Sequence, residues 1–285
     1  MEDARQRDMD GTSRARQFVV YGMLGLLALL VLFPFYWLIL SAFKSKEAIF
    51  AAPPQFYLRS LELGNFNEVF EQTRFFRSFF NSVFIAVLHC TLTLFLSSLA
   101  GYAFAVYPHA PGRERLFAFV LATMMIPGVV TLIPVFTILT KLQLVNTYTA
   151  MIVPGAANAF GIFWMRQSVQ QHIHPDLLDA ARIDGCSEFG LYWRIALPLL
   201  RPALAALGIL VLIGNWNNLM WAFIVLRTDE MYTLPLMIYL LQGEMRTPYG
   251  QVMAASLLAT LPLVIAFLLF QRQFIQGIAA GAIKS

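Results

Sequence analysis

Long apolar runs separated by short polar connections dominate the 285 residues of this chain. The stretches that lack Asp, Glu, Lys and Arg are residues 17–43, 78–112, 116–140, 142–165, 202–226 and 247–271, and each holds at least 24 residues. About 20 apolar residues in a helix cross a hydrocarbon core of about 30 Å. The pattern therefore predicts an all-α, polytopic membrane protein with six transmembrane helices.

Composition and charge agree with this prediction. The chain is 59% hydrophobic and 13% charged, with a mean hydropathy of +0.66, which is more apolar than a soluble domain requires. The first apolar run is too long for a signal-peptide core, so we expect residues 1–17 to form an N-terminal tail and 18–285 one transmembrane domain. If the N-terminal tail is cytoplasmic, the predicted cytoplasmic segments carry 12 Lys and Arg residues and the predicted external segments carry 8. This excess on the cytoplasmic side agrees with the positive-inside rule. Both termini are then cytoplasmic, and the protein lies in the cell's inner (cytoplasmic) membrane.

The net charge, the cysteines and the histidines do not indicate a nucleic-acid-binding protein, a disulfide-rich protein or a metalloprotein. A net charge of +4 could suit nucleic acid, but the basic residues are scattered over both faces, as interfacial anchors are. Cys90 and Cys186 give no disulfide framework, and His172 with His174 does not make a metal-ligand set. We expect neither a nucleic-acid partner nor a bound metal.

Proline and glycine interrupt several of the apolar runs. They occur as Pro127-Gly128, Pro134 and Pro154-Gly155, near the membrane midplane, where lost helical hydrogen bonds are tolerated beside protein or a wet cavity. This pattern favours a mobile helix bundle that lines a cavity, although helix kinks that serve only packing would produce the same sequence pattern. Pro34 predicts a kink in the first helix, and residues 44–78 predict an external loop with short interfacial helices.

A polar insertion over about residues 166–201 carries strong helix signals. Pro175 suits the first position of a helix, and Asp176 lies near its positive end. Gly185 is placed to end that helix in a left-handed turn, and Ser187 to cap a second helix that runs up to Pro198. We expect a helix, a sharp turn and another helix in the cytosol.

The first of these helices has features of a docking element. Ala180 and Ala181 allow close backbone approach, while Asp179 and Asp184 offer charge to a partner's Arg or Lys, so the helix can lodge in a groove. An ordinary amphipathic connector on the bilayer surface would look the same. The local pattern leaves both interpretations open.

The spacing from Asp179-Ala180-Ala181 through Gly185 to Ile195-Ala196-Leu197-Pro198 closely resembles the cytoplasmic coupling loop of ABC-importer permeases. Several further sequence motifs together resemble those of the carbohydrate (maltose-type) class of these permeases. They are Met125-Ile126-Pro127-Gly128, Leu132-Ile133-Pro134, Asn146-Thr147-Tyr148-Thr149-Ala150, Phe160-Gly161-Ile162-Phe163, Asn215-Trp216-Asn217-Asn218 and the segment 276–284. The resemblance covers nearly the whole chain. Asp179 stands where Glu is usual, Cys186 where Ala is usual, and Tyr192-Trp193 near a usual Phe.

The resemblance implies a type I ABC-importer permease fold and an assembly of two permease subunits, two cytosolic ATPase subunits and an extracytoplasmic substrate-binding protein. The residues it implies for coupling to the ATPase are Asp179, Ala180, Ala181, Asp184, Gly185, Ile195, Leu197 and Pro198. The resemblance also implies that the C-terminal tail, residues 272–285, contacts the ATPase through Gly281, Ala282, Ile283 and Lys284. The chain has no G-x-x-x-x-G-K-[ST] motif, so ATP and Mg are expected on the partner, with no cofactor and no enzyme activity here.

A polar cluster in the fifth run is suited to a solute pathway. It consists of Asn215, Trp216, Asn217, Asn218 and Trp221. Amides can bond sugar hydroxyls and aromatic faces can pack on pyranose rings, but the same asparagines could bond neighbouring helices.

The leading hypothesis is therefore the permease subunit of a carbohydrate importer. The alternatives are a permease for a polyamine, an amino acid or a polyol phosphate, and a passive scaffold. An intramembrane enzyme is a further alternative, for which only His89 beside Cys90 lies within a span.

Overall fold

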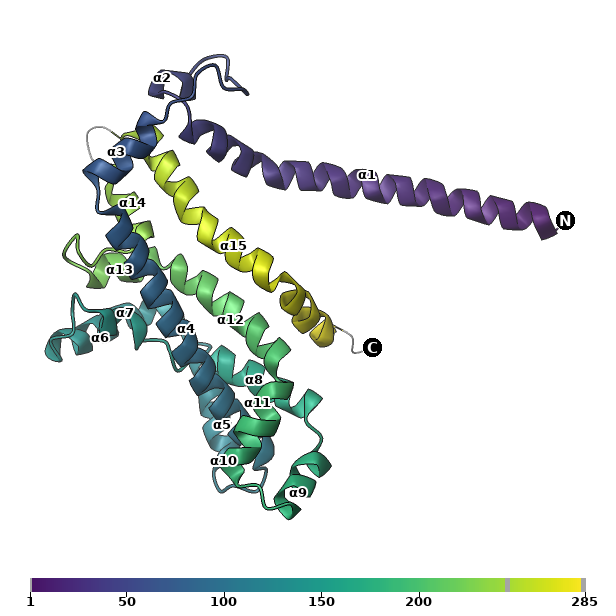
Figure 1. Ribbon diagram of the computed structural model, residues 1–285. Helices are drawn as coiled ribbons and strands as arrows, with labels where there is room; N and C mark the ends of the chain where they lie inside the picture. The colour runs from purple at the N-terminus through teal and green to yellow at the C-terminus, as the bar shows by residue number, and fades with distance from the viewer. Residues whose placement is uncertain (1, 244–246, 283–285) are drawn as a thin grey trace. The chain divides into compact units, whose positions relative to one another are not determined.

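A computed structural model describes residues 2–243 and 247–282, and every regular element in these ranges is helical (Figure 1). The chain forms two compact units. Met1–Glu71 and Gln242–Leu258 make unit 1, and Gln72–Leu241 with Ala259–Ser285 makes unit 2.

Unit 1 contains the first apolar run and most of the segment predicted to be external. Helix α1 (Glu2–Ala42) runs without interruption through Pro34, and the short helices α2 (Lys46–Ile49) and α3 (Gly64–Gln72) follow. The Asn65 side chain donates hydrogen bonds of 2.9 Å to the carbonyls of Ala42 and Lys44, which holds α3 to the end of α1. The predicted short helices of the external segment are thus present.

Unit 2 is built around α4 (Phe75–Val106), which packs against α8 (Ala159–His172) and α12 (Arg201–Trp216). A Cβ at Gly101 would lie 2.7 Å from the Met165 Cβ, so the absence of a side chain there permits the close approach of α4 and α8. The other helices of this unit are α5 (Arg113–Thr123), α6 (Gly128–Lys141), α7 (Tyr148–Ile152), α9 (Pro175–Ile183), α10 (Glu188–Gly190), η1 (Leu191–Ala196), α11 (Leu197–Leu199), α13 (Leu219–Val225), α14 (Leu234–Leu240) and the later part of α15 (Tyr249–Ala282).

The predicted count of six transmembrane helices is not confirmed, whereas the predicted breaks near Pro127 and Pro154 are present. Among the described residues, three helices are long and apolar enough to cross a membrane: Arg16–Ala42, Phe75–Val106 and Tyr249–Leu269. Two bent pairs raise the count to at most five: α5 with α6, bent by 100°, and Glu188–Leu199 with α12, bent by 77°. Pro127 precedes α6, and Pro154 separates α7 from α8, because proline lacks the amide hydrogen that a continuous helix requires.

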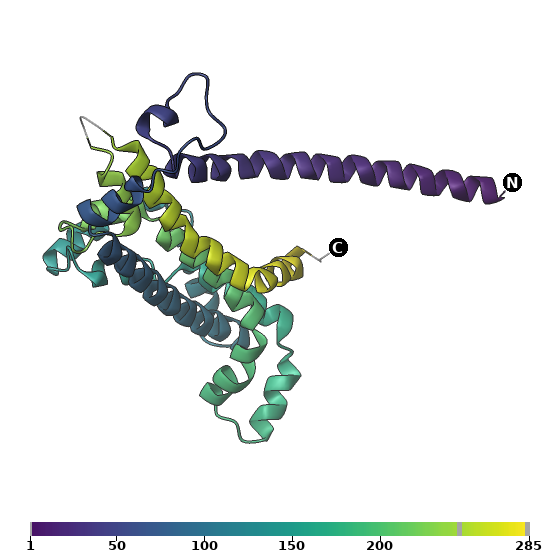
Figure 2. The same cartoon turned by 45° about the horizontal axis from the view of Figure 1, so that its top comes forward.

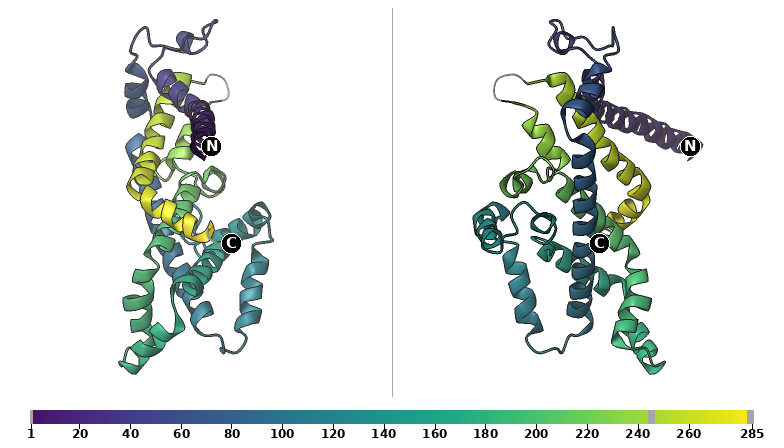
Figure 3. Two further views of the ribbon diagram at one scale, coloured as in Figure 1. Left: turned by 90° about the vertical axis from the view of Figure 1, so that its right-hand side faces the viewer. Right: turned by 60° about the vertical axis from the view of Figure 1, so that its left-hand side comes forward.

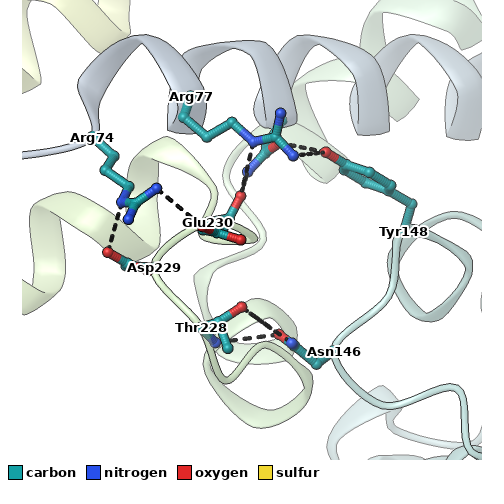
Figure 4. A network of polar contacts seen from close by, with 8 residues as sticks. Arg74, Arg77, Asn146, Tyr148, Thr228, Asp229 and Glu230 are labelled. Atoms are coloured by element: carbon teal, nitrogen blue, oxygen red, sulfur yellow. Dashed lines mark hydrogen bonds and ion pairs between the residues drawn. The ribbon is translucent and has the colours of Figure 1, made fainter.

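A polar network joins the start of α4 to α7 and to the connection between α13 and α14 (Figure 4). The fully buried Asn81 side chain donates to the carbonyls of Glu230 (2.8 Å) and Tyr232 (3.0 Å), and it accepts from the Tyr148 hydroxyl (2.7 Å). Arg77 donates to the same Glu230 carbonyl (3.1 Å) and to Tyr148 (3.3 Å). The connection is therefore tied to the bundle through its own backbone.

Candidate functional site

The polar insertion folds as a helical hairpin, defined here as residues 175–199, which Figure 2 shows in green. Its first arm, α9, has Pro175 in the first turn. The turn contains Gly185 at φ +83°, a left-handed conformation that favours glycine, and the Gly185 N–H donates to the Arg182 carbonyl at 3.0 Å. Ser187 caps the second arm by accepting from the Gly190 N–H at 3.2 Å. The predicted helix, turn and helix are confirmed.

Arg182 links the two arms of the hairpin. Its guanidinium lies 2.7 Å from a carboxylate oxygen of Asp179 on the first arm and 2.8 Å from one of Glu188 on the second. Glu188 also accepts from the hydroxyl of Tyr107 (2.6 Å), which follows α4. Hydrogen bonding to Glu188 raises the pKa of Arg182, while burial, followed by the bond to Glu188, raises the pKa of Tyr107 to about 12. The charge of Asp179 is thus engaged within the chain.

The Tyr107 contact is possible because the connection after α4 and the hairpin tip lie at the same end of unit 2, as both views in Figure 3 show. At that tip, Asp184 is exposed and forms no ion pair with another described residue. Asp184, rather than Asp179, is the carboxylate still available to a partner.

The second arm is built into the core of unit 2. Its side chains join a buried cluster with α4, α8 and α12, whose members are Tyr102, Met165, Val169, Ile173, Leu178, Leu191, Tyr192, Ala196, Leu200 and Leu207. Ile195 and Leu197 pack against this cluster, whereas Pro198 is exposed. The Tyr192 and Ser98 hydroxyls lie 2.8 Å apart, which adds a polar link to α4. Displacement of this arm must therefore move the bundle helices, because packed cores do not deform freely.

The first arm presents an exposed face. Ala180 is exposed and Ala181 is half-buried against the core, so the two predicted docking alanines have different environments. Ile183, next to the turn, is 87% exposed, and Phe189 beyond the turn is also exposed. Neither residue was predicted as a contact from the sequence, although a large apolar residue between Arg182 and Asp184 is itself a signal of an interface.

Three of the five residues predicted for the solute pathway border one cavity of about 310 Å³, namely Asn215, Asn218 and Trp221. The other two lie elsewhere. Trp216 is buried, with its ring centroid 6.5 Å from that of Phe79, and the Asn217 amide donates to the Ile213 carbonyl at 2.9 Å. The asparagine cluster also divides α12 from α13, because Asn218 caps α13.

The break between α7 and α8 shapes the wall of this cavity. Pro154 has no amide hydrogen for the Ala150 carbonyl, which instead accepts from the Trp221 indole N–H at 2.8 Å. The Ile152 carbonyl lies 2.8 Å from Nδ1 of His89 on α4. Two rings that are distant in sequence thus satisfy the carbonyls at the end of α7, and both border the cavity.

The predicted tail contact lies at the limit of the described structure. Helix α15 ends at Ala282, so the backbone of Gly281 and Ala282 is helical. Ile283 and Lys284 lie outside the described residues.

Residues 94–280, which hold the whole hairpin and most of the cavity lining, match the family described as binding-protein-dependent transport system inner membrane component. The chain belongs to this family. The permease is 39% identical to an arabinooligosaccharides transport system permease protein (AraQ) of Halalkalibacterium halodurans over 90% of this chain and 93% of the relative. It is 35% identical to the lactose transport system permease protein LacG of Rhizobium radiobacter over 95% and 97%.

A solved structure shares the fold. It is described as a bacterial ABC transporter involved in the import of the acidic polysaccharide alginate, and one of its chains superimposes with a TM-score of 0.80 at 25% identity, covering 92% of the permease and 98% of that chain. The predicted ABC-importer permease family and fold class are confirmed. The permease is an inner membrane transport component.

Proposed function

We propose that this chain is one of two permease subunits in an ATP-driven importer, and that it forms half of the pathway for a carbohydrate delivered by an extracytoplasmic binding protein. The hairpin carries this proposal, because both arms are anchored in the bundle, the first through Leu178, while the residues around the turn are open to a partner. A rigid connection of this kind can pass movement of a partner to α4, α8 and α12.

In this proposal the partner at the hairpin is one of two cytosolic ATPase subunits, which bind ATP and Mg. The exposed Ile183 and Phe189 supply apolar contact area, and Asp184 supplies an unpaired charge. The coupling residues are Asp179, Ala180, Ala181, Asp184, Gly185, Ile195, Leu197 and Pro198, with the C-terminal tail reaching the same partner. The hairpin and both termini are then cytoplasmic.

The lining of the cavity supports a neutral solute. Its polar side chains are His89, Asn158, Asn215 and Asn218, and none of the described residues that border it is Asp, Glu, Lys or Arg. A polyamine would favour carboxylates and a polyol phosphate would favour Arg or Lys. The similarity to permeases named for arabinooligosaccharides and lactose supports a sugar.

Reconstitution tests this proposal. The permease, its partner permease, the ATPase subunits and the binding protein are assembled in liposomes, and uptake of maltose, lactose, an arabinooligosaccharide, putrescine and glycerol phosphate is measured. We expect uptake of at least one of the sugars that requires both ATP and the binding protein. Uptake of only the cationic or the phosphorylated solute would overturn the assignment.

A further inference from the structure

The hydrogen bond made by His89 determines which of its ring nitrogens carries the proton. In a continuous helix the Ile152 carbonyl would accept from the Ala156 N–H, but that N–H donates to the Val153 carbonyl (3.1 Å). The His89 Nδ1 atom lies 2.8 Å from the freed carbonyl, and because a carbonyl oxygen only accepts, Nδ1 carries the hydrogen. In the neutral ring Nε2 is then an acceptor, and it has no hydrogen-bond partner among the described residues.

Helix capping orients two of the cavity asparagines in a similar way. The Oδ1 atom of Asn158 accepts from the Gly161 N–H at 2.9 Å, and that of Asn218 accepts from the Trp221 N–H at 3.3 Å. The side-chain oxygens are thus used by the backbone, which leaves each Nδ2 as a donor. Besides the Asn215 amide, the cavity is therefore bordered by two amide donors and one imidazole acceptor whose roles are fixed by the backbone.

An aromatic face borders the same space. Phe160 is 40% exposed, whereas Trp221 is 7% exposed and its N–H is bonded to Ala150. Of the aromatic residues that sequence reasoning proposed for sugar packing, neither Trp216 nor Trp221 offers an open face. Phe160 does, and it lies two residues from the Asn158 cap.

We infer that this cavity is a contact site for a neutral pyranose in which Phe160 packs on the apolar face of the ring, His89 Nε2 accepts a hydroxyl hydrogen, and Asn158 and Asn218 donate to hydroxyl oxygens. Hydroxyl groups both donate and accept, so they match this set, whereas ammonium or phosphate groups leave part of it unpaired. The volume of about 310 Å³ lies at the lower end of small-molecule sites, which span roughly 300–1,000 Å³. This inference rests on the proposed function and assigns a sugar contact to this subunit.

Two pairs of variants in the reconstituted transporter test the site. In His89→Asn, the amide N–H can replace Nδ1–H as the donor to the Ile152 carbonyl, but the shorter side chain has no acceptor at the position of Nε2. Phe160→Leu keeps an apolar side chain but removes the aromatic face. We expect each to lower sugar imported per ATP hydrolysed by about fivefold, the effect of one neutral hydrogen bond or packing contact. Phe160→Tyr retains the ring and should keep more of the sugar-to-ATP ratio than Phe160→Leu does. Phe223→Leu should behave as wild type, because the parent ring is 49% exposed and lies outside the cavity lining.

The outcomes separate this site from the function on which it rests. If the wild-type transporter imports none of the three sugars, the proposed function fails. If the wild type imports sugar and both His89→Asn and Phe160→Leu keep its sugar-to-ATP ratio, the site is overturned. If His89→Asn does not assemble, labelling of Phe160→Cys by a hydrophilic maleimide decides, because the transported sugar should slow it severalfold and unchanged labelling would contradict the site.

Discussion

The Gly185→Pro variant is expected to assemble and hydrolyse ATP while importing solute at least about tenfold more slowly than wild type. Proline holds φ near −65° and lacks an amide hydrogen, whereas Gly185 has φ +83° and donates to the Arg182 carbonyl. Proline at a position with an incompatible φ and a hydrogen-bonded N–H destabilises the structure by more than about 1 kcal/mol. The turn must therefore rearrange, and the two arms change their relative orientation. Uptake and ATP hydrolysis measured on the same proteoliposomes give the ratio directly.

Two alanine variants control for simple strain. Gly185→Ala forces a side chain into the left-handed region at roughly 1 kcal/mol and should lower uptake only partly. Gly112→Ala imposes the same conformational strain, since Gly112 has φ +76° and open space around its Cβ position, but it lies in the connection before α5. Normal transport by Gly185→Pro, or equal losses in the two alanine variants, would count against transmission through the hairpin.

The Asn81→Leu variant is expected to lower the free energy of unfolding by about 3 kcal/mol. Leucine fills a similar volume but leaves the Tyr232 carbonyl without the Asn81 donor and the Tyr148 hydroxyl without its acceptor, while the Glu230 carbonyl keeps only its bond from Arg77. Each unpaired buried group costs about 1–3 kcal/mol. Thermal unfolding of the purified transporter in detergent should show a lower midpoint for this variant.

Asn217→Leu is the matched control, because Asn217 is exposed and bonds only within its own helix turn. It should change the midpoint little. Equal shifts in the two variants would mean that the network at the start of α4 does not hold the connection between α13 and α14.

Local signals predicted the hairpin well. Pro175, Gly185 and Ser187 act on their own backbone neighbours, so rules for helix starts and ends apply to them without knowledge of the fold. The same rules could not tell that Asp179 pairs with Arg182, or that Ile195 and Leu197 face the core. Those contacts depend on which faces of the hairpin helices pack against the bundle.

Hydropathy predicted the membrane class, but its count of six spans is not confirmed among the described residues. Apolar composition reports the surrounding solvent, whereas Pro127, Pro154 and Asn217 determine where a helix can continue. The cavity was only partly predictable for a different reason. His89 and Trp221 are separated by 63 and 71 residues from the carbonyls of α7 that position them, and such pairings are properties of the tertiary structure.

The most direct measurement is cross-linking of the hairpin tip to the ATPase in the intact transporter. An Ile183→Cys variant, in a background with Cys186 replaced by serine, is compared with Ile133→Cys, whose parent side chain is 77% exposed on α6, outside the hairpin. The account predicts a cross-link to the ATPase subunit from position 183 and none from position 133. Labelling of position 183 by an impermeant reagent from outside the cell, or no cross-link in an assembly that transports, would contradict it.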